Sequence, residues 1–197
     1  MTCVTLPCLP AASDECLLAR LAKGEREALE ELFGRYRGLA YRVAIRLLGN
    51  EADALDAVQD GFVKALTHIQ SFQGRSSFKT WLLRVVSNAA LDLGRQRGRR
   101  ETISLDAPDN GERDSHQPLS LDDPGRGLHR ADLRRLLNEA LATLPEAQRQ
   151  TFVLNADAGL SYREVAEALG ISIGTVMSRL YYARQKLRAF LEQRITP

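Results

Sequence analysis

The chain has 197 residues, of which 44% are hydrophobic and 26% are charged, and this is enough to build one domain or two small ones. The net charge is only +2, so nucleic-acid binding would have to show in how the charge is distributed. No apolar run approaches the roughly 20 residues that a membrane-spanning helix needs, and the N-terminus, interrupted by Pro7 and Pro10, lacks the basic start of a secretory signal. We therefore expect a cytoplasmic protein.

The three cysteines, Cys3, Cys8 and Cys16, all lie near the start of the chain. Their odd number argues against a closed set of disulfides, and their spacing, with no histidine nearby, fits no zinc site. We interpret them as free thiols of a loose N-terminal arm. A redox or metal sensor is the alternative.

Residues 13–100 are predicted to form an all-helical bundle. Ser13, followed by two acids, is typical of a helix N-cap, and Gly24 is expected to end this first helix. A second helix, ended by Gly49 and Asn50, carries apolar residues at steps of three and four, which place them on one stripe. The stripe consists of Leu29, Leu32, Phe33, Tyr36, Leu39, Ala40, Val43, Ala44 and Leu47.

Two further helices complete this block, and no alternating β-branched segment predicts a sheet. The third is expected to bury Leu55, Val58, Phe62, Ala65, Leu66 and Ile69. After a polar break at residues 71–74, Ser76 or Ser77 is expected to cap the fourth helix, which runs into Gly94 and a basic cluster. Its inward positions are Phe78, Trp81, Leu82, Val85, Val86 and Ala89.

Residues 101–127 change character, because apolar residues become sparse and acids outnumber bases. The acids are Glu101, Asp106, Asp109, Glu112, Asp114, Asp122 and Asp123, and the bases are Arg113 and Arg126. We predict a flexible, mostly disordered acidic linker.

Residues 128–197 are predicted to be helical again, with a helix that begins near Pro145 and ends at Gly159. Ser161 and Glu164 form a capping-box pattern that opens a short helix. Gly170 makes a tight turn, and Ser172 caps a long final helix whose inward residues are Val176, Leu180, Ala183, Leu187 and Phe190. Two helices joined by a tight turn with glycine are a helix-turn-helix.

The second helix of such a motif enters the major groove and offers its first residues to base edges. Here its outward positions are Thr175, Met177, Ser178, Arg179, Tyr181, Tyr182, Arg184 and Gln185. From residue 179 onward the helix has five basic residues and one acidic residue, Glu192. The basic residues are Arg179, Arg184, Lys186, Arg188 and Arg194. The alternative is an ordinary amphipathic hairpin with a solvated face.

A second basic stretch accompanies the fourth helix and consists of Arg75, Lys79, Arg84, Arg95, Arg97, Arg99 and Arg100. Dense arginines indicate phosphate binding, although a solubilising tail or a localisation signal would have the same composition. Phe72, Phe78 and Trp81 lie nearby and could stack on unpaired bases. Because Phe78 and Trp81 fall on the inward stripe, core packing is the competing interpretation.

Acids gather at the start and on the outer side of the third helix: Glu51, Asp53, Asp56 and Asp60. Such a face suits a basic protein partner. A plain solvated face explains the spacing equally well.

Four stretches, in order and joined by a linker, resemble the extracytoplasmic-function group of bacterial sigma factors from about residue 17 to 191. The first is residues 17–25 followed by Ala28, Leu32, Phe33 and Tyr36, and the second is residues 53–62. The third joins residues 72–74, 78–82 and 84–88. The fourth joins residues 144–146, 159–162, 164–166, 174–176 and 178–180.

The resemblance implies a domain organisation: a disordered arm (residues 1–12), a region-two bundle (13–100), the linker (101–127) and a region-four helix-turn-helix domain (128–197). It implies that region two contacts the polymerase clamp through Asp53, Asp56, Gln59, Asp60 and Phe62. It implies that the same region captures a flipped base of the melted minus-ten element. The residues concerned would be Arg75, Ser76, Lys79, Trp81, Arg84, Asn88, Arg95, Arg97, Arg99 and Arg100.

Region four would read the minus-thirty-five element through Ser172, Gly174, Thr175, Met177, Ser178, Arg179, Tyr182 and Arg184. In the family, the linker passes through polymerase toward the active-site channel and the RNA exit path. Two departures stand out. The clamp motif usually carries an acid where this chain has Leu55, and the recognition helix usually carries bases at the positions of Met177 and Tyr182.

The expected function is therefore a sigma factor that directs core polymerase to promoters, with core polymerase, promoter DNA and an anti-sigma factor as partners. A DNA-binding repressor or activator that acts without polymerase is the alternative, but it leaves the first bundle unexplained. An enzyme is disfavoured because His68, His116 and His129 are scattered and no catalytic motif is present. Neither a cofactor nor a metal is expected.

Overall fold

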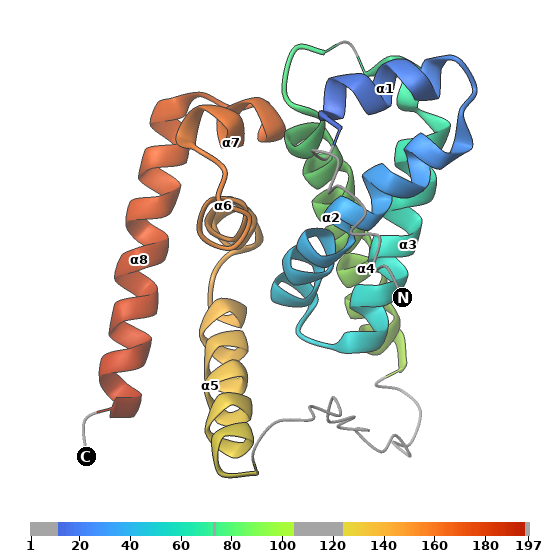
Figure 1. Ribbon diagram of the computed structural model, residues 1–197. Coiled ribbons are helices and arrows are strands. Elements are labelled where there is room, and N and C mark those ends of the chain that lie inside the picture. The colour runs from blue at the N-terminus through green and yellow to red at the C-terminus, as the bar shows by residue number, and fades with distance from the viewer. Residues whose placement is uncertain (1–11, 73, 105–123, 196–197) are drawn as a thin grey trace, which may run out of the picture. The chain divides into compact units, whose positions relative to one another are not determined.

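The computed structural model describes residues 12–72, 74–104 and 124–195, and Figure 1 shows its helices. They are α1 (Asp14–Ala22), α2 (Arg26–Leu48), α3 (Glu51–Thr67), the 3₁₀ turn η1 (Ile69–Ser71), α4 (Phe78–Ser104), α5 (Pro124–Ala142), α6 (Glu146–Ala156), α7 (Tyr162–Leu169) and α8 (Ile173–Ile195). These residues contain no strand, which confirms the predicted all-α fold class. None of the described helices has both the length and the apolar character needed to cross a bilayer.

Contacts between residues divide the chain into two compact units, Met1–Gly38 and Leu39–Pro197. The first holds α1 and the first part of α2, with Leu17 and Leu32 fully buried. Asp14 joins the two helices, because it accepts hydrogen bonds from Arg35 Nη1 at 2.5 Å and from the Tyr36 hydroxyl. Burial and the Asp14 carboxylate raise the pKa of Tyr36 to about 12, so this phenol stays protonated and continues to donate.

In the second unit, α3 packs closely against α4 because it offers small side chains to its neighbour. Buried positions on α3 include Ala54, Ala57, Gly61 and Ala65. The prediction that Leu55 is buried is wrong: its side chain is 49% exposed. Successive residues of a helix are turned by about 100°, so a contact face centred on these small residues leaves Leu55 outside it.

Four of the five helix starts with a side-chain cap match those expected from the sequence. Ser13 and Ser172 accept from the N–H groups three residues later, at 3.3 and 3.1 Å, and Ser161 forms the complete capping box. Of the two candidates before α4, Ser77 is the cap. Asn50, expected only to end α2, also caps α3.

Helical backbone reaches into both ends of the predicted linker, since α4 continues to Ser104 and α5 begins at Pro124. Residues 105–123 lie outside the described residues, as do residues 1–11 of the N-terminal arm with Cys3 and Cys8. Cys16 lies within them and carries an exposed free thiol. The predicted domain boundaries stay a prediction.

The Gly61→Ala change should destabilise the protein. A Cβ at this position would lie 2.9 Å from Val86 Cγ2 and 3.0 Å from Val86 Cα, so backbone would have to shift. Overpacking of this kind costs about 1–3 kcal/mol and should exceed the helix-propensity gain of about 1 kcal/mol. Thermal unfolding measures the change. Gly34→Ala in α2, where a Cβ meets nothing within 4 Å, is the control and should stabilise. A rise in melting temperature for both variants would contradict the close approach.

Candidate polymerase and nucleic-acid interfaces

The outer face of α3 carries most of the residues predicted to contact polymerase. Asp56, Gln59 and Asp60 are exposed, and Asp60 forms an ion pair with Lys64 one turn later at 2.8 Å. Leu55 and Val63 are also exposed, at 49% and 54%. The face is therefore acidic with two apolar side chains, a combination that can both steer a basic partner and bury surface against it.

Asp53 and Phe62 differ from this exposed group. Phe62 is half-buried, and the Asp53 side chain is only 21% exposed. Asp53 Oδ2 accepts from Asn50 Nδ2 and from Arg97 Nη1, both at 2.5 Å. The structure thus pairs a residue predicted to contact polymerase with one predicted to contact the minus-ten element.

Partial burial acts to raise the pKa of the Asp53 carboxyl, but the hydrogen bonds from Asn50 and Arg97 outweigh it. The net effect is a pKa below the ordinary range of an aspartate. Asp53 therefore remains an anion. It stabilises the start of α3 through its hydrogen bonds with Asn50 and accepts a hydrogen bond from the guanidinium of Arg97 in α4.

The residues just before and within the first turns of α4 form an aromatic cluster. Phe72, Phe78 and Trp81 have ring centroids 5.4–5.9 Å apart, and Phe78 is 3% exposed. Trp81 is half-buried. These contacts support the packing interpretation of Phe78 and Trp81 over base stacking.

The other residues predicted to contact the minus-ten element lie along α4 or just before it. Ser76 and Lys79 are half-buried. Arg84 and Asn88 are exposed and four residues apart, so they share one face of the helix. The remaining exposed members of the set are Arg75, Arg95, Arg97, Arg99 and Arg100.

Side chains of α6 and α7 contact this part of α4. The buried Gln150 donates from Nε2 to Ser87 Oγ at 3.2 Å and to Asn88 Oδ1 at 3.1 Å. Arg95 forms an ion pair with Glu146, with Nε 3.1 Å from Oε2. Sequence reasoning missed both α6 residues because their partners lie 51 to 63 positions away, beyond any local spacing pattern.

Helices α7 and α8 form the predicted helix-turn-helix. Ser161 and Glu164 satisfy each other's backbone N–H groups at the start of α7, and these hydrogen bonds lower the pKa of Glu164. Gly170 ends α7 with φ at +65°, a left-handed conformation that glycine adopts without strain. Helix α8 starts three residues later, which gives the tight turn of the motif.

The residues predicted to read the minus-thirty-five element occupy the first half of α8. Ser172 and Thr175 hydrogen-bond to each other at 2.9 Å, and Ser178 donates to the Thr175 carbonyl. Gly174 is exposed, Met177 and Tyr182 are 54% and 57% exposed, and Arg179 is half-buried. Arg184 is exposed and donates to the Tyr162 hydroxyl at 3.4 Å.

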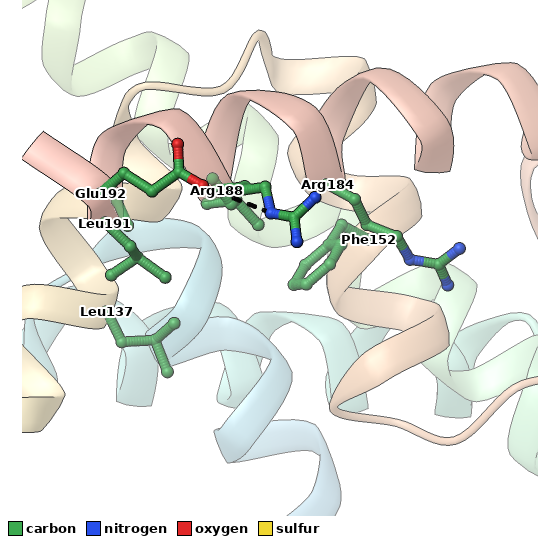
Figure 2. Close-up of a pocket in the computed structure, with 8 residues that line it drawn as sticks. Leu137, Phe152, Arg184, Arg188, Leu191 and Glu192 are labelled. Atoms are coloured by element: carbon green, nitrogen blue, oxygen red, sulfur yellow. Dashed lines mark ion pairs between the residues drawn. The ribbon is translucent and has the colours of Figure 1, made fainter.

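A second surface feature lies along the later part of α8 and was not predicted from the sequence. This feature is an apolar groove with a volume of about 610 Å³. Figure 2 shows its lining residues Leu137, Phe152 and Leu191, with Arg184, Arg188 and Glu192 along it. Arg188 Nε lies 3.5 Å from Glu192 Oε1. The groove combines apolar lining residues with charged residues along it, as grooves that bind an amphipathic helix do.

Two family models match the chain: Sigma-70 region 2 over residues 32–100 and Sigma-70 region 4 over residues 134–187. The ECF RNA polymerase sigma-E factor of Haemophilus influenzae is 31% identical over 188 residues, which span 94% of this chain and 96% of that protein. The chain belongs to the ECF sigma factors of RNA polymerase. The sigma-E factor of Escherichia coli strain K12 is 32% identical over 89% of this ECF sigma factor and 92% of its own length.

Two solved structures share the fold of this ECF sigma factor. CnrH, solved in complex with the cytosolic domain of CnrY, matches with a TM-score of 0.69 and 28% identity over 93% of this chain and 99% of that one. RpoE of Bartonella quintana, solved with the anti-sigma factor NepR, matches with a TM-score of 0.65 and 27% identity over 83% of this chain and 96% of that one. The region 2 match contains α3 and the basic part of α4, and the region 4 match contains the whole of α7.

The Asp53→Asn change should reduce the acid sensitivity of this sigma factor. Because the folded pKa of Asp53 is lowered, its contribution to stability is present above its unfolded pKa of about 3.9 and is lost as the pH falls through the folded value. The wild type should therefore lose more unfolding free energy than the variant as the pH drops from about 5 to about 2. Denaturant titrations at several pH values measure this, with Asp56→Asn as the matched control. Identical pH slopes for wild type and Asp53→Asn would contradict the assignment.

Proposed function

We propose that this sigma factor binds core polymerase through the outer face of α3, with Asp56, Gln59 and Asp60 as the contacting polar residues. Asp53 positions that face by fixing the start of the helix, and Phe62 supports it from a half-buried position. The main support for this proposal is that the side chains of Asp56, Gln59 and Asp60 are all exposed on one helix, which lies within the Sigma-70 region 2 match.

Promoter DNA is bound at two further places. The exposed cations of α4, together with Asn88, hold the melted minus-ten element, and Trp81 supports them through the aromatic cluster. The first half of α8 enters the major groove of the minus-thirty-five element. The capped α7, the glycine turn and the exposed start of α8 support this role.

The protein acts by binding alone, in the cytoplasm where polymerase and promoter DNA are found, and needs no cofactor. An anti-sigma factor is a further partner. This inference is supported by the solved RpoE structure, which contains the anti-sigma factor NepR, and by the apolar groove of Figure 2, which could take a helix of such a partner.

Run-off transcription tests the function as a whole. With core polymerase and a library of promoter fragments, the full chain should yield transcripts from a defined set of start sites, because it supplies both promoter contacts. Core polymerase alone is the control and should give no such set. If the chain retains sequence-specific DNA binding but gives no promoter-specific transcript and no complex with core polymerase, it is a repressor or activator that acts independently.

The Asp56→Arg change tests the polymerase contact. Reversing a charge at the centre of the α3 face should raise the Kd for core polymerase roughly ten-fold, about 1.4 kcal/mol, and make binding less sensitive to salt. Pull-down and titration against core polymerase measure this. Glu30→Arg, the same charge reversal at an exposed position of α2, is the control and should bind normally. Unchanged affinity of Asp56→Arg would remove α3 from the interface.

A further inference from the structure

The first half of α8 exposes a cluster of apolar side chains. Ile173, Met177, Tyr181 and Tyr182 are 45%, 54%, 58% and 57% exposed. They make up four of the seven large hydrophobic side chains that the described residues leave exposed. Single exposed apolar residues are ordinary, but a cluster on one short helix segment marks a contact surface.

Neighbouring contacts hold this cluster in place. The rings of Tyr181 and Tyr182 meet edge to face with centroids 5.4 Å apart. Gln185 Nε2 donates to the Tyr181 hydroxyl at 2.9 Å. Met177, one turn before Tyr181, lines the same surface groove together with Tyr162. These contacts hold the two tyrosines before any partner arrives, which lowers the entropic cost of fixing their side chains on binding.

Helix geometry points the tyrosines toward the groove that a recognition helix enters. Val176, Leu180 and Ala183 are buried against the rest of the fold. At about 100° per residue, Tyr181 and Tyr182 lie on the opposite side of the helix, and Met177 lies at its edge. In a helix-turn-helix this side meets base edges in the major groove.

The charges of α8 are distributed differently from its apolar residues. Between residues 173 and 183 the one cation is Arg179, which is half-buried, whereas Arg184, Lys186 and Arg188 are all exposed. Guanine is usually recognised by an exposed guanidinium that reaches O6 and N7, and residues 173–183 offer none that is fully exposed. An apolar side chain instead matches the C5-methyl group of thymine, the one apolar feature on the major-groove edge of a base pair.

We propose that Met177 and Tyr182 contact thymine methyl groups, so that this chain selects thymine at two positions of its upstream promoter element. The proposal rests on the function proposed above for α8. Tyr181 is a positioning residue that holds the ring of Tyr182, while the exposed cations Arg184, Lys186 and Arg188 bind phosphates and add affinity without selecting sequence.

Uracil substitution tests the proposal, because uracil keeps the O4 acceptor of thymine and lacks only the methyl group. The holoenzyme is first used to select its preferred promoters from a random library. Each thymine of the upstream element is then replaced by uracil in turn, and holoenzyme binding is titrated. We expect a loss of roughly four-fold at two positions, which corresponds to about 0.8 kcal/mol for one buried methyl-sized group.

Two variants assign the contacts. Met177→Ala should bind thymine and uracil equally at one of the two positions, and Tyr182→Ala should do so at the other, because each lacks one partner of the pair. Leu133→Ala, which removes an equally exposed apolar side chain from α5, is the control and should keep both uracil penalties. Thermal unfolding verifies that all three variants remain folded.

Several results would overturn the proposal. Equal binding of thymine and uracil at every upstream position, with promoter-specific transcription intact, refutes methyl recognition and leaves the sigma-factor function standing. Variants that lower transcription while keeping both uracil penalties would place the apolar face against a protein instead. Loss of all promoter-specific transcription by the wild-type holoenzyme would refute the proposed function itself, and this inference with it.

Discussion

Because Gly61 has no side chain, the backbone of α3 can approach Val86 of α4 closely, and the direction of the remaining side chains on α3 depends on this approach. With Ala54, Ala57 and Ala65 also turned toward the neighbouring helix, α3 has one narrow contact face of small residues. Val58 is the one larger side chain buried on this face, and the charged residues lie elsewhere on the helix. The acidic face that includes Asp56 is thus a geometric result of close helix packing as well as of composition.

Polar contacts connect surfaces that the sequence suggests are separate. Asp53, predicted to contact polymerase, accepts a hydrogen bond from Arg97, predicted to contact the minus-ten element. Asn88, also predicted to contact the minus-ten element, accepts a hydrogen bond from Gln150 of α6. Gln150 is only 8% exposed, and its amide would lose those partners if α6 moved away from α4. Because water would replace the lost partners, each of these hydrogen bonds contributes a net stabilisation of about 0.5–1.5 kcal/mol.

The features that could be predicted from the sequence are those set by neighbours along the chain. Capping at Ser161 depends on Glu164 three residues away, and the turn at Gly170 depends on one backbone conformation. The exposure of Leu55 could not be predicted in this way, because apolar spacing alone did not show which residues α4 contacts. The partners of Asp53 and Asn88 lie 44 and 62 positions away, so only the fold brings them together.

Helix α8 is shared by two surfaces, since Arg184 and Arg188 line both the apolar groove of Figure 2 and the groove formed by the tyrosines. A ligand that engages these guanidiniums from one side alters the free energy with which a ligand binds on the other. Such coupling is reciprocal by thermodynamic necessity. An anionic occupant of either groove would compete for the same two cations.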